Sequence, residues 1–531
     1  MMLNKSVFKS SPEDAWSFLL LIVAIIFGGF VRIYPATVVD FPLNDGGMFY
    51  SMTRDLINNN YLLPKFASYN ALNIPFAYPP FGFYFTGFIS EFLNINLIQL
   101  FHWLPPILAV LTIPVFFTLV KTVTSSKINA AMAALVFALV PRTYSWFIFG
   151  GGITRALYLI FYLLAVTFTF RLFSIKNNNY KVNLFLSILF NGLAVITHPE
   201  VIIHAITTGI LIWLIFGKNR AGTKKAMYVG LGVLILTSIW WFPVIRNHGL
   251  KPMLSAFSTG MYSPGAFFRF LVPDISEEPL LPIFNVMAIL GIGLELYYRR
   301  AFLILWFIIP LITVPRSAPA ISILPLAIAA GNAIQVIMVR LFTQERGKES
   351  NWFNLIEKDK FLKVFLGYLI MIGLVNSFYF DLRIPTLSLS EKDREAMMWV
   401  EKNTEKESHF ITLTGSRDPF LDPVSEWFPV LALRTNFSTI QGREWLPDKH
   451  FMQYREDVTN LQKCFDLACL DHWGFSSFDY IYIQKVAGGQ LNTINNSTAS
   501  FHFLLNELSM REDINKVFEN ELAIIFKLSA K

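Results

Sequence analysis

Charged residues are scarce in this chain of 531 residues. Only 15% of its positions are Asp, Glu, Lys or Arg, whereas 54% are hydrophobic, and the mean hydropathy is +0.48. A soluble protein carries roughly a quarter charged residues. So much apolar surface cannot be hidden in a water-soluble globule of this length, and lipid must cover the excess. The composition therefore predicts an integral membrane protein.

Cysteine is almost absent as well, since Cys464 and Cys469 are the only two. We predict that they form a disulfide. Their C-x4-C spacing can close a small loop if the two Cα atoms lie within about 7 Å. Both also fall in a part of the chain that we expect on the oxidising side of the membrane. The alternative is two buried thiols.

Signatures of several other functions are missing. The sequence has no Walker motif, no G-x-G-x-x-G and no G-x-S-x-G, so nucleotide hydrolysis and serine-hydrolase chemistry lack support. The net charge of +7 does not indicate nucleic-acid binding, because the Lys and Arg residues occupy short loops between apolar runs. His198, Glu200 and His204 could ligate a metal in principle, but their spacing is not a standard helical one. We therefore expect no metal site.

Apolar runs dominate residues 16–380. A membrane helix needs about 20 apolar residues, and on this basis we predict about eleven spans. They are 16–34, 101–121, 128–146, 154–172, 182–198, 200–217, 226–245, 281–298, 301–315, 318–340 and 362–380. The first run follows Lys5 and Lys9 but lacks a small-x-small cleavage site, so we expect a retained helix rather than a signal peptide. His198-Pro199 separates two neighbouring runs, because proline disfavours helix in its predecessor and removes a donor.

The Lys and Arg residues predict the orientation. With the N-terminus inside, every Lys/Arg-rich break falls on the inner side. This threading requires that 80–98, which begins at Pro79-Pro80 and carries Glu91, is a helix at the outer surface and not a span. The outer side then collects four segments, which are 35–79, Arg142–Arg155, Arg246–Pro279 and the C-terminal residues.

Residues 381–531 have the composition of an ordinary soluble protein. Ser390-Glu-Lys-Asp393 fits a helix N-cap, and 409–415, 480–484 and 522–527 have the character of strands. We therefore predict two domains. The first is a transmembrane module over 1–380, with its first outer loop at 35–100, and the second is a small extracytoplasmic α/β domain over 381–531.

The first outer loop offers a candidate base in the sequence Asp40-Phe-Pro-Leu-Asn-Asp45-Gly-Gly-Met-Phe-Tyr50. Asp45 would lie at the membrane–water boundary, where a partly desolvated carboxylate can accept a proton from a substrate. The alternative is a helix cap, because Asp45 or Asn44 could cap a helix over 46–58.

Other candidates are polar residues near the outer ends of spans. The arginines are Arg142, Arg155, Arg246 and Arg316. Arginine is costly there unless it reaches interfacial water or binds an anion such as phosphate, and both interpretations stay open for each. Arg155, after Gly150-Gly-Gly152, and Arg316, between two prolines, are the best placed. His198 and Glu200 lie at an outer turn, where they are either functional or a polar break satisfied by nearby backbone.

This arrangement resembles the GT-C superfamily of membrane glycosyltransferases, which includes protein O-mannosyltransferases, aminoarabinose transferases and catalytic subunits of oligosaccharyltransferases. Asn44-Asp45-Gly-Gly-Met-Phe-Tyr50 and Tyr78-Pro79-Pro80-Phe81 fit its long first loop, which has an acid after the first span and then a surface helix. Segments that resemble the soluble domain of uncharacterised bacterial and archaeal members are Glu391–Thr404, Glu426-Trp427-Phe428-Pro429, Arg434 and Gly442-Arg443-Glu444-Trp445.

Two departures from the superfamily pattern stand out. Gly46 occupies the place of the usual second acid, which casts doubt on any metal role. The W-W-D signature of oligosaccharyltransferases is absent, and Trp240-Trp241-Phe242 at a span end is no substitute. The second departure argues against transfer of a preassembled glycan to asparagine.

The resemblance implies a transferase that moves a sugar from a polyprenyl-phosphate-linked donor to a glycan, lipid or protein acceptor at the outer membrane face. It implies no nucleotide, soluble cofactor or metal. Asp45 would be the base, and Arg155 and Arg316 would neutralise the donor phosphate. Tyr78, His198, Glu200 and Arg246 would bind substrate. The alternatives are a transporter or flippase for a lipid-linked or anionic solute, or a non-catalytic scaffold; we find no paired half-chains, which a transporter often has.

Overall fold

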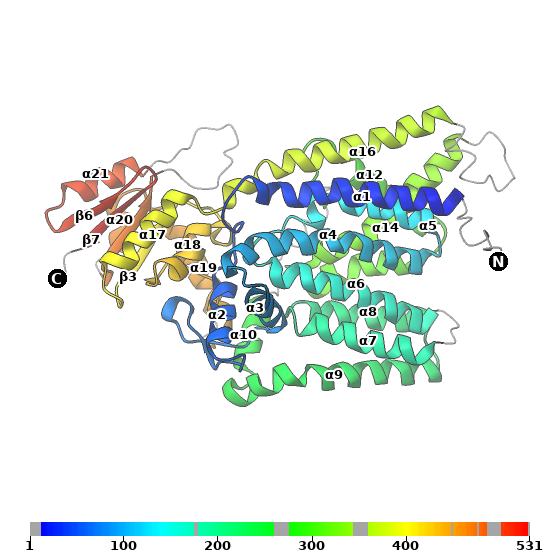
Figure 1. The fold of residues 1–531 in the computed structure, drawn as a ribbon, viewed down its shortest axis with the longest axis horizontal. Coiled ribbons are helices and arrows are strands. Elements are labelled where there is room, and N and C mark those ends of the chain that lie inside the picture. Colours follow the sequence, from blue (N-terminus) through cyan, green and yellow to red (C-terminus); the bar gives the residue numbers. More distant parts are fainter. Residues whose placement is uncertain are drawn as a thin grey trace, which may run out of the picture.

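The described residues form a helical bundle and, towards the C-terminus, a smaller part that contains a β-sheet, which is called the C-terminal domain below (Figure 1). The computed structural model describes residues 12–174, 179–259, 275–342, 359–447, 450–474, 477–485 and 501–528. Lys5 and Lys9 lie outside these ranges, as do 260–274 of the predicted outer loop and 343–358 of the predicted inner charged stretch.

Each predicted apolar run forms a helix. Among the described residues, six helices are long and apolar enough to cross a membrane, namely α1 (Pro12–Thr37), α4 (Leu97–Thr124), α6 (Gly152–Ser174), α9 (Arg220–His248), α14 (Ala318–Phe342) and α16 (Lys360–Asp381). Five apolar helices are shorter, namely α5 (Lys127–Leu139), α7 (Tyr180–Val195), α8 (Val201–Phe216), α12 (Ile283–Tyr297) and α13 (Ala301–Thr313). Because a helix of 13 residues is only about 20 Å long, the count of eleven spans stays a prediction.

The short helix α5 is central in the bundle. Every residue from Ile128 to Leu139 is buried, and α5 packs against α1, α4 and α14. Close approach depends on small side chains, since a Cβ on Gly331 would lie 2.7 Å from the backbone of Ala133. The sequence predicted this helix to run on to residue 146, but it ends before Pro141, which lacks an N–H and disfavours helix in the residue before it.

The segment between α1 and α4 is folded onto one end of the bundle. It contains α2 (Gly47–Asn58), a pair of antiparallel strands, β1 (Phe66–Ala67) and β2 (Ile74–Pro75), the short helix η1 (Tyr69–Ala71), and α3 (Phe81–Leu93). The helix expected after Pro79-Pro80 is therefore present as α3. Its exposed Phe88 and Phe92 rings stack 5.6 Å apart. Its place at a membrane surface stays a prediction.

The described C-terminal residues form a five-stranded sheet with the order β4-β3-β5-β7-β6. The strands are β3 (His409–Leu413), β4 (Thr435–Asn436), β5 (Tyr480–Gln484), β6 (Ile514–Glu519) and β7 (Ala523–Leu528). β3 runs parallel to β4 and β5, whereas β7 is antiparallel to β5 and β6. The three predicted strands are β3, β5 and β7, and the sequence did not predict β4 and β6.

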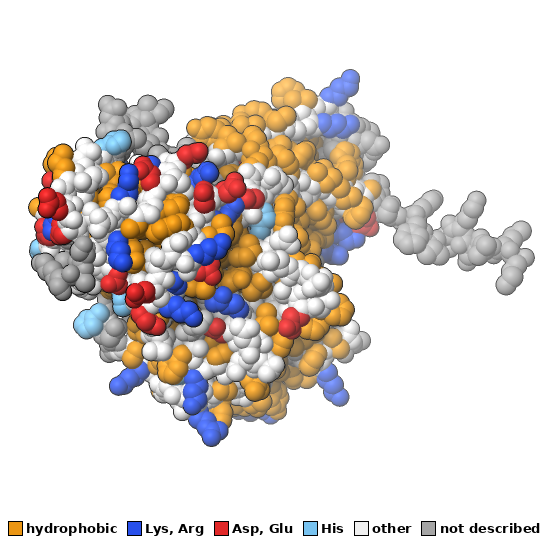
Figure 2. All heavy atoms as spheres, turned by 60° about the vertical axis from the view of Figure 1, so that its left-hand side comes forward, with side chains coloured by type: hydrophobic (Ala, Val, Ile, Leu, Met, Phe, Trp, Pro, Cys, Tyr) orange, Lys and Arg blue, Asp and Glu red, His pale blue; other side chains and the backbone are white. Residues whose placement is uncertain are grey.

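Helices accompany this sheet and join it to the bundle. They are α17 (Glu391–Asn403), α18 (Pro423–Leu431), α19 (Phe451–Leu461), α20 (Leu467–His472), α21 (His502–Met510) and the short helix η5 (Arg443–Trp445). Ser390 caps α17 by accepting from the amide of Asp393 at 3.1 Å. α18 packs on α2 and η1, and η5 packs on α10 (Lys251–Thr259). Figure 2 shows charged side chains gathered over this end and hydrophobic ones over the bundle.

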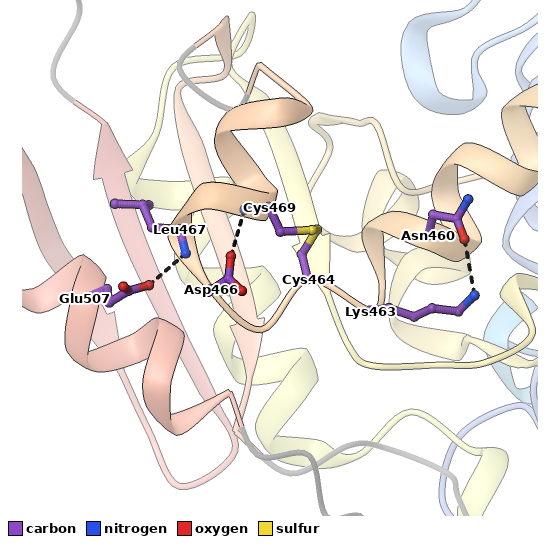
Figure 3. The surroundings of a disulfide bond; sticks show 7 residues. All are labelled: Asn460, Lys463, Cys464, Asp466, Leu467, Cys469 and Glu507. Atoms are coloured by element: carbon purple, nitrogen blue, oxygen red, sulfur yellow. Dashed lines mark hydrogen bonds between the residues drawn. A yellow bond between two sulfur atoms is a disulfide. The ribbon is translucent and has the colours of Figure 1, made fainter.

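Cys464 and Cys469 are joined by a disulfide (Figure 3). Their Cα atoms lie 5.4 Å apart, and the bond closes the turn between α19 and α20. The carboxylate of Asp466 caps α20 by accepting from the amide of Cys469 at 2.8 Å. This pairing is the one that the spacing predicts.

Candidate functional site

Asp45 lies in the turn between α1 and α2 and contacts the start of α6. Its carboxylate accepts two hydrogen bonds from the guanidinium of Arg155, at 2.7 Å on Oδ2 and 2.9 Å on Oδ1. The amide of Gly151 also donates to Oδ1, at 2.9 Å. The two charged side chains are only 17% and 18% exposed. A bidentate pair of this kind fixes both side chains in one orientation.

The helix-cap interpretation of Asp45 is wrong. α2 begins at Gly47, and its N-cap residue is Gly46. Neither Asn44 nor Asp45 is therefore the N-cap residue of this helix. The acid at this helix end is instead Glu426 from α18. Its Oε1 accepts from the amides of Gly46 and Met48, at 3.3 and 3.1 Å. The carboxylate of Asp45 is thereby directed to Arg155 and not to α2.

Glycines allow three segments to meet at this point. A Cβ on Gly150 would lie 2.1 Å from the carbonyl oxygen of Asp45, and one on Gly47 would lie 2.5 Å from the carbonyl oxygen of Glu426. Gly46 has φ +124°, which L-residues rarely adopt, and a Cβ there would lie 3.1 Å from the backbone of Gly150. In this structure an acid at position 46 would therefore be strained and crowded.

In addition to Asp45, Arg155 has a second hydrogen-bond partner. Its Nε donates to the carbonyl oxygen of Trp146 at 2.8 Å, and its guanidinium lies 5.9 Å from the centre of the Trp146 ring. The described contacts use three of the five N–H groups of the guanidinium. In this structure Arg155 therefore orients Asp45, a role that the sequence did not predict for it.

Tyr78 and His198 are aromatic side chains that contact each other close to the Asp45–Arg155 ion pair. The Tyr78 ring lies 5.9 Å from His198 and 5.6 Å from Trp445, both edge-on, and its hydroxyl lies 3.3 Å from Oγ1 of Thr154. Burial raises the pKa of the Tyr78 phenol well above its ordinary value, so the hydroxyl stays neutral. Nδ1 of His198 accepts from the amide of Glu200 at 3.3 Å, which leaves Nε2 as the donor of the neutral ring.

Glu200 and Arg316 form a second, more open charge pair. Their Oε1 and Nε atoms are 3.7 Å apart, and the side chains are 29% and 42% exposed. Nη1 of Arg316 also donates to the hydroxyl of Thr259 at 3.3 Å. The charges of Arg155 and Glu200 both influence the pKa of Tyr78. The charges of Arg155 and Arg316 both influence the pKa of His198. These residues and Asp45 therefore form one group.

Other predicted residues lie elsewhere. Arg246 is exposed in the last turn of α9, and within the described ranges no hydrogen bond or ion pair joins it to the group, so its role stays a prediction. Arg142 pairs with Glu277 at 2.9 Å, and Nε2 of His204 bonds to the hydroxyl of Ser317 at 2.8 Å. Among the residues that the structure describes, no three His, Cys, Asp or Glu are arranged to hold a metal ion.

Two acids that the C-terminal domain brings to this place were not predicted as site residues from the sequence. Glu426 is 2% exposed and Glu444 is partly buried on η5. Oε2 of each acid and Nε1 of Trp445 are buried without a hydrogen-bond partner among the described residues. Burial raises the pKa of both carboxyls, and that of Glu426 reaches about 8, with the charge of Asp45 as a second cause. Only the adjacent glycines Gly46-Gly47 hinted at such a close approach.

No family model matches the chain, and no curated protein matches its sequence. Solved structures share its fold. The archaeal oligosaccharyltransferase AglB from Archaeoglobus fulgidus, in complex with an inhibitory peptide and a dolichol-phosphate, is 13% identical, with a TM-score of 0.55 over 90% of this chain and 70% of that one. ArnT from Cupriavidus metallidurans, bound to undecaprenyl phosphate, is 12% identical, with a TM-score of 0.56 over 96% and 98%.

A third similar structure is the arabinofuranosyltransferase AftD from Mycobacteria. It is 12% identical and has a TM-score of 0.57 over all of this chain and 40% of that one. At such low identity these likenesses concern the fold, and all three proteins are glycosyltransferases of the GT-C type. The chain therefore has the fold of the GT-C membrane glycosyltransferases, as its sequence resemblance predicts.

Proposed function

We propose that the protein is a membrane glycosyltransferase that moves a sugar from a polyprenyl-phosphate-linked donor to an acceptor hydroxyl. The observation that carries this proposal is the oriented Asp45–Arg155 pair, which lies beside Tyr78 and His198 at one end of a GT-C bundle. That ArnT was solved with undecaprenyl phosphate and AglB with a dolichol-phosphate supports a donor of this class.

Eleven helices cross the membrane in this proposal, and the site lies at its outer face. Lys121, in the last turn of α4, and Lys127, the first residue of α5, lie at one end of the bundle, whereas α2 and the C-terminal domain lie at the other (Figure 1). This distribution agrees with a positive inner side. Of the five shorter helices, α5 is buried from Ile128 to Leu139, whereas α7, α8, α12 and α13 each expose apolar side chains that lipid would cover, such as Phe185, Ile206, Ile289 and Ile312.

Asp45 acts as the base in this proposal. It takes the proton of the acceptor hydroxyl, the acceptor oxygen bonds to the anomeric carbon, and the bond from that carbon to the phosphate oxygen breaks. The electron pair leaves with the polyprenyl phosphate. Arg155 holds the carboxylate in place, so that its orientation is set before the substrate arrives.

Arg316 neutralises the phosphate in this proposal. Its guanidinium is 42% exposed, and its ion pair with Glu200 is long, at 3.7 Å, so an anion can compete for it. Charge develops on the leaving phosphate as the bond breaks, and a fixed cation there stabilises the transition state more than the ground state. Nε2 of His198 and the hydroxyl of Tyr78 are donors for hydroxyl groups of the sugar or the acceptor. The residues themselves supply this chemistry, and it calls for no soluble cofactor or metal.

The test uses the purified full chain in nanodiscs with polyprenyl-phosphate sugars radiolabelled in the sugar. Release of polyprenyl phosphate together with a labelled acceptor supports a transferase. A flippase would move the intact donor between leaflets without cleaving it, and a scaffold would do neither. Movement of intact donor with no cleavage, for every sugar and acceptor tried, would overturn the proposal.

A further inference from the structure

The C-terminal domain holds the loop that carries Asp45. We define the Asp45 loop as residues 43–48. Nε1 of Trp427 donates to the carbonyl oxygen of Asn44 at 2.9 Å, and Nδ2 of Asn44 donates to the carbonyl oxygen of Phe420 at 3.0 Å. The loop therefore both accepts hydrogen bonds from residues 420–427 and donates hydrogen bonds to them. The site is built by two parts of the chain that are far apart in sequence.

Glu426 makes the most unusual of these contacts. Its Oε1 accepts from the amides of Gly46 and Met48, and its carbonyl oxygen accepts from the hydroxyl of Tyr69 at 2.6 Å. The first amides of a helix have no partner within the helix, so a carboxyl group placed there fixes the helix start. Oε2 has no partner among the described residues although it is buried. A buried polar atom without a partner is rare in proteins, so it calls for an explanation beyond the helix cap.

We propose that Glu426 is the second acid of the site, supplied by the C-terminal domain next to Gly46, where an acid would be strained. It is a positioning residue, which acts by holding the amides that follow Asp45. This inference rests on the function proposed above. It assigns to α18 a part in the transfer reaction, so that the C-terminal domain belongs to the reaction centre.

The protonation of Glu426 gives this role a pH dependence. The charged and titratable groups around it are Asp45 on the loop, Glu444 on η5 and Tyr69 on η1, and the amides of Gly46 and Met48 favour its anion. Burial is the main cause that raises its pKa to about 8. At neutral pH Glu426 therefore carries a proton. Because Oε1 accepts from both amides, this proton resides on Oε2.

Ionisation of Glu426 above pH 8 would place a second negative charge close to Asp45. An anionic donor would then bind less well, because two carboxylates would repel its phosphate. Turnover should therefore require the protonated form of Glu426. Glutamine mimics that form, since its carbonyl oxygen can accept from the two amides and it does not titrate.

The experiment compares Glu426→Gln and Glu426→Ala with the wild type in nanodiscs. The matched control is Asp393→Asn, a buried acid of the same domain that bonds to Tyr482 at 2.8 Å and does not contact the Asp45 loop. kcat and KM are measured with a radiolabelled polyprenyl-phosphate sugar from pH 6 to 9.5. One pH unit above the pKa, kcat/KM of the wild type should have fallen about tenfold.

Glu426→Gln should keep kcat/KM within about threefold over the same range, whereas Asp393→Asn should lose activity at high pH as the wild type does. Glu426→Ala should lower kcat at every pH, because it removes the acceptor of both amides. The same alkaline loss in Glu426→Gln and the wild type would overturn the proposal.

Hydrogen exchange at the amides of Gly46 and Met48 gives a readout without turnover. At one pH, exchange should be at least about tenfold faster in Glu426→Ala than in the wild type, but nearly unchanged in Glu426→Gln. Unchanged exchange in Glu426→Ala would overturn the positioning role. If the exchange results hold but no donor is cleaved by the wild type, the proposed transferase function fails and the positioning role of Glu426 stands.

Discussion

The guanidinium of Arg155 holds both carboxylate oxygens of Asp45, so the proposed base and its cation form a single unit. The two residues lie 110 positions apart in the sequence. Their loops can approach because Gly150 and Gly151 leave room for the backbone and carboxylate of Asp45. A change at either partner should therefore alter the other, and effects of mutations at these two positions should not add.

Asp45→Asn should lower kcat about 10²–10⁴-fold while the protein stays folded, because asparagine cannot accept the proton. The loss of its partner will also leave Arg155 without a counter-charge, which should cost roughly 1–3 kcal/mol of stability. Turnover and thermal unfolding are measured together. Asp40→Asn is the control, since Asp40 is an exposed acid that pairs with Arg394 at 2.6 Å. Near-normal turnover by Asp45→Asn would show that this acid is not the base.

Arg316→Gln should lower kcat/KM by about 10- to 100-fold with little change in stability, because it removes a partly exposed cation from the proposed phosphate position. Steady-state kinetics over a range of donor concentrations would measure this. The matched control is Arg142→Gln, which breaks a pair with Glu277 and should affect stability more than kinetics. Equal kinetic effects of the two substitutions would contradict a specific role for Arg316.

Glu426→Gln should stabilise the protein at pH 8 but not at pH 4.5. The pKa of Glu426 is about 8 in the folded protein against an ordinary value of 4.5, so its contribution to stability is complete below 4.5 and is lost as the pH rises towards 8. The expected gain at pH 8 is on the order of 4 kcal/mol. Thermal unfolding of both proteins across this range measures it. A difference that does not vary with pH would contradict the assigned protonation.

The orientation of the bundle can be tested with single cysteines in a background in which Cys464 and Cys469 are replaced by serine. Thr223 is exposed at the predicted inner end of α9, and Ser258 is exposed on α10 at the predicted outer side. An impermeant thiol reagent added to intact cells should label Ser258→Cys and not Thr223→Cys. Ser255 would be a poor reporter, because it is buried and bonded to the carbonyl oxygen of Leu446. Labelling of Thr223→Cys and not of Ser258→Cys would mean that the bundle has the opposite orientation in the membrane.

The helices were predictable because each apolar run is continuous and its ends are marked locally. Pro199 separates α7 from α8, and Ser390 begins α17, as the sequence indicates. Pro141 marks the end of α5 just as locally, and the predicted span 128–146 is too long because it continues past this proline. The strand β4, with two residues, is too short to produce a pattern of its own.

The site was only partly predictable, because its key contacts join distant segments. Asp45 and Arg155 were each identified from their place near a span end, but no local signal shows that they pair. The contact of Glu426 with Gly46 spans 380 residues, and its carboxyl substitutes in space for an acid that the sequence lacks at that position. Spacing along the chain cannot reveal a residue that reaches the site from another domain.

The same contact determines when the site is completed during synthesis. The loop with Asp45 emerges early from the ribosome, and Glu426 follows 380 residues later. At about 5–20 residues per second, this interval lasts roughly 20–80 seconds. During that time the first helices can enter the membrane while α2 still lacks the carboxyl group that holds its start. The chain would therefore become competent for the proposed chemistry only after α18 has been synthesised and has packed against α2.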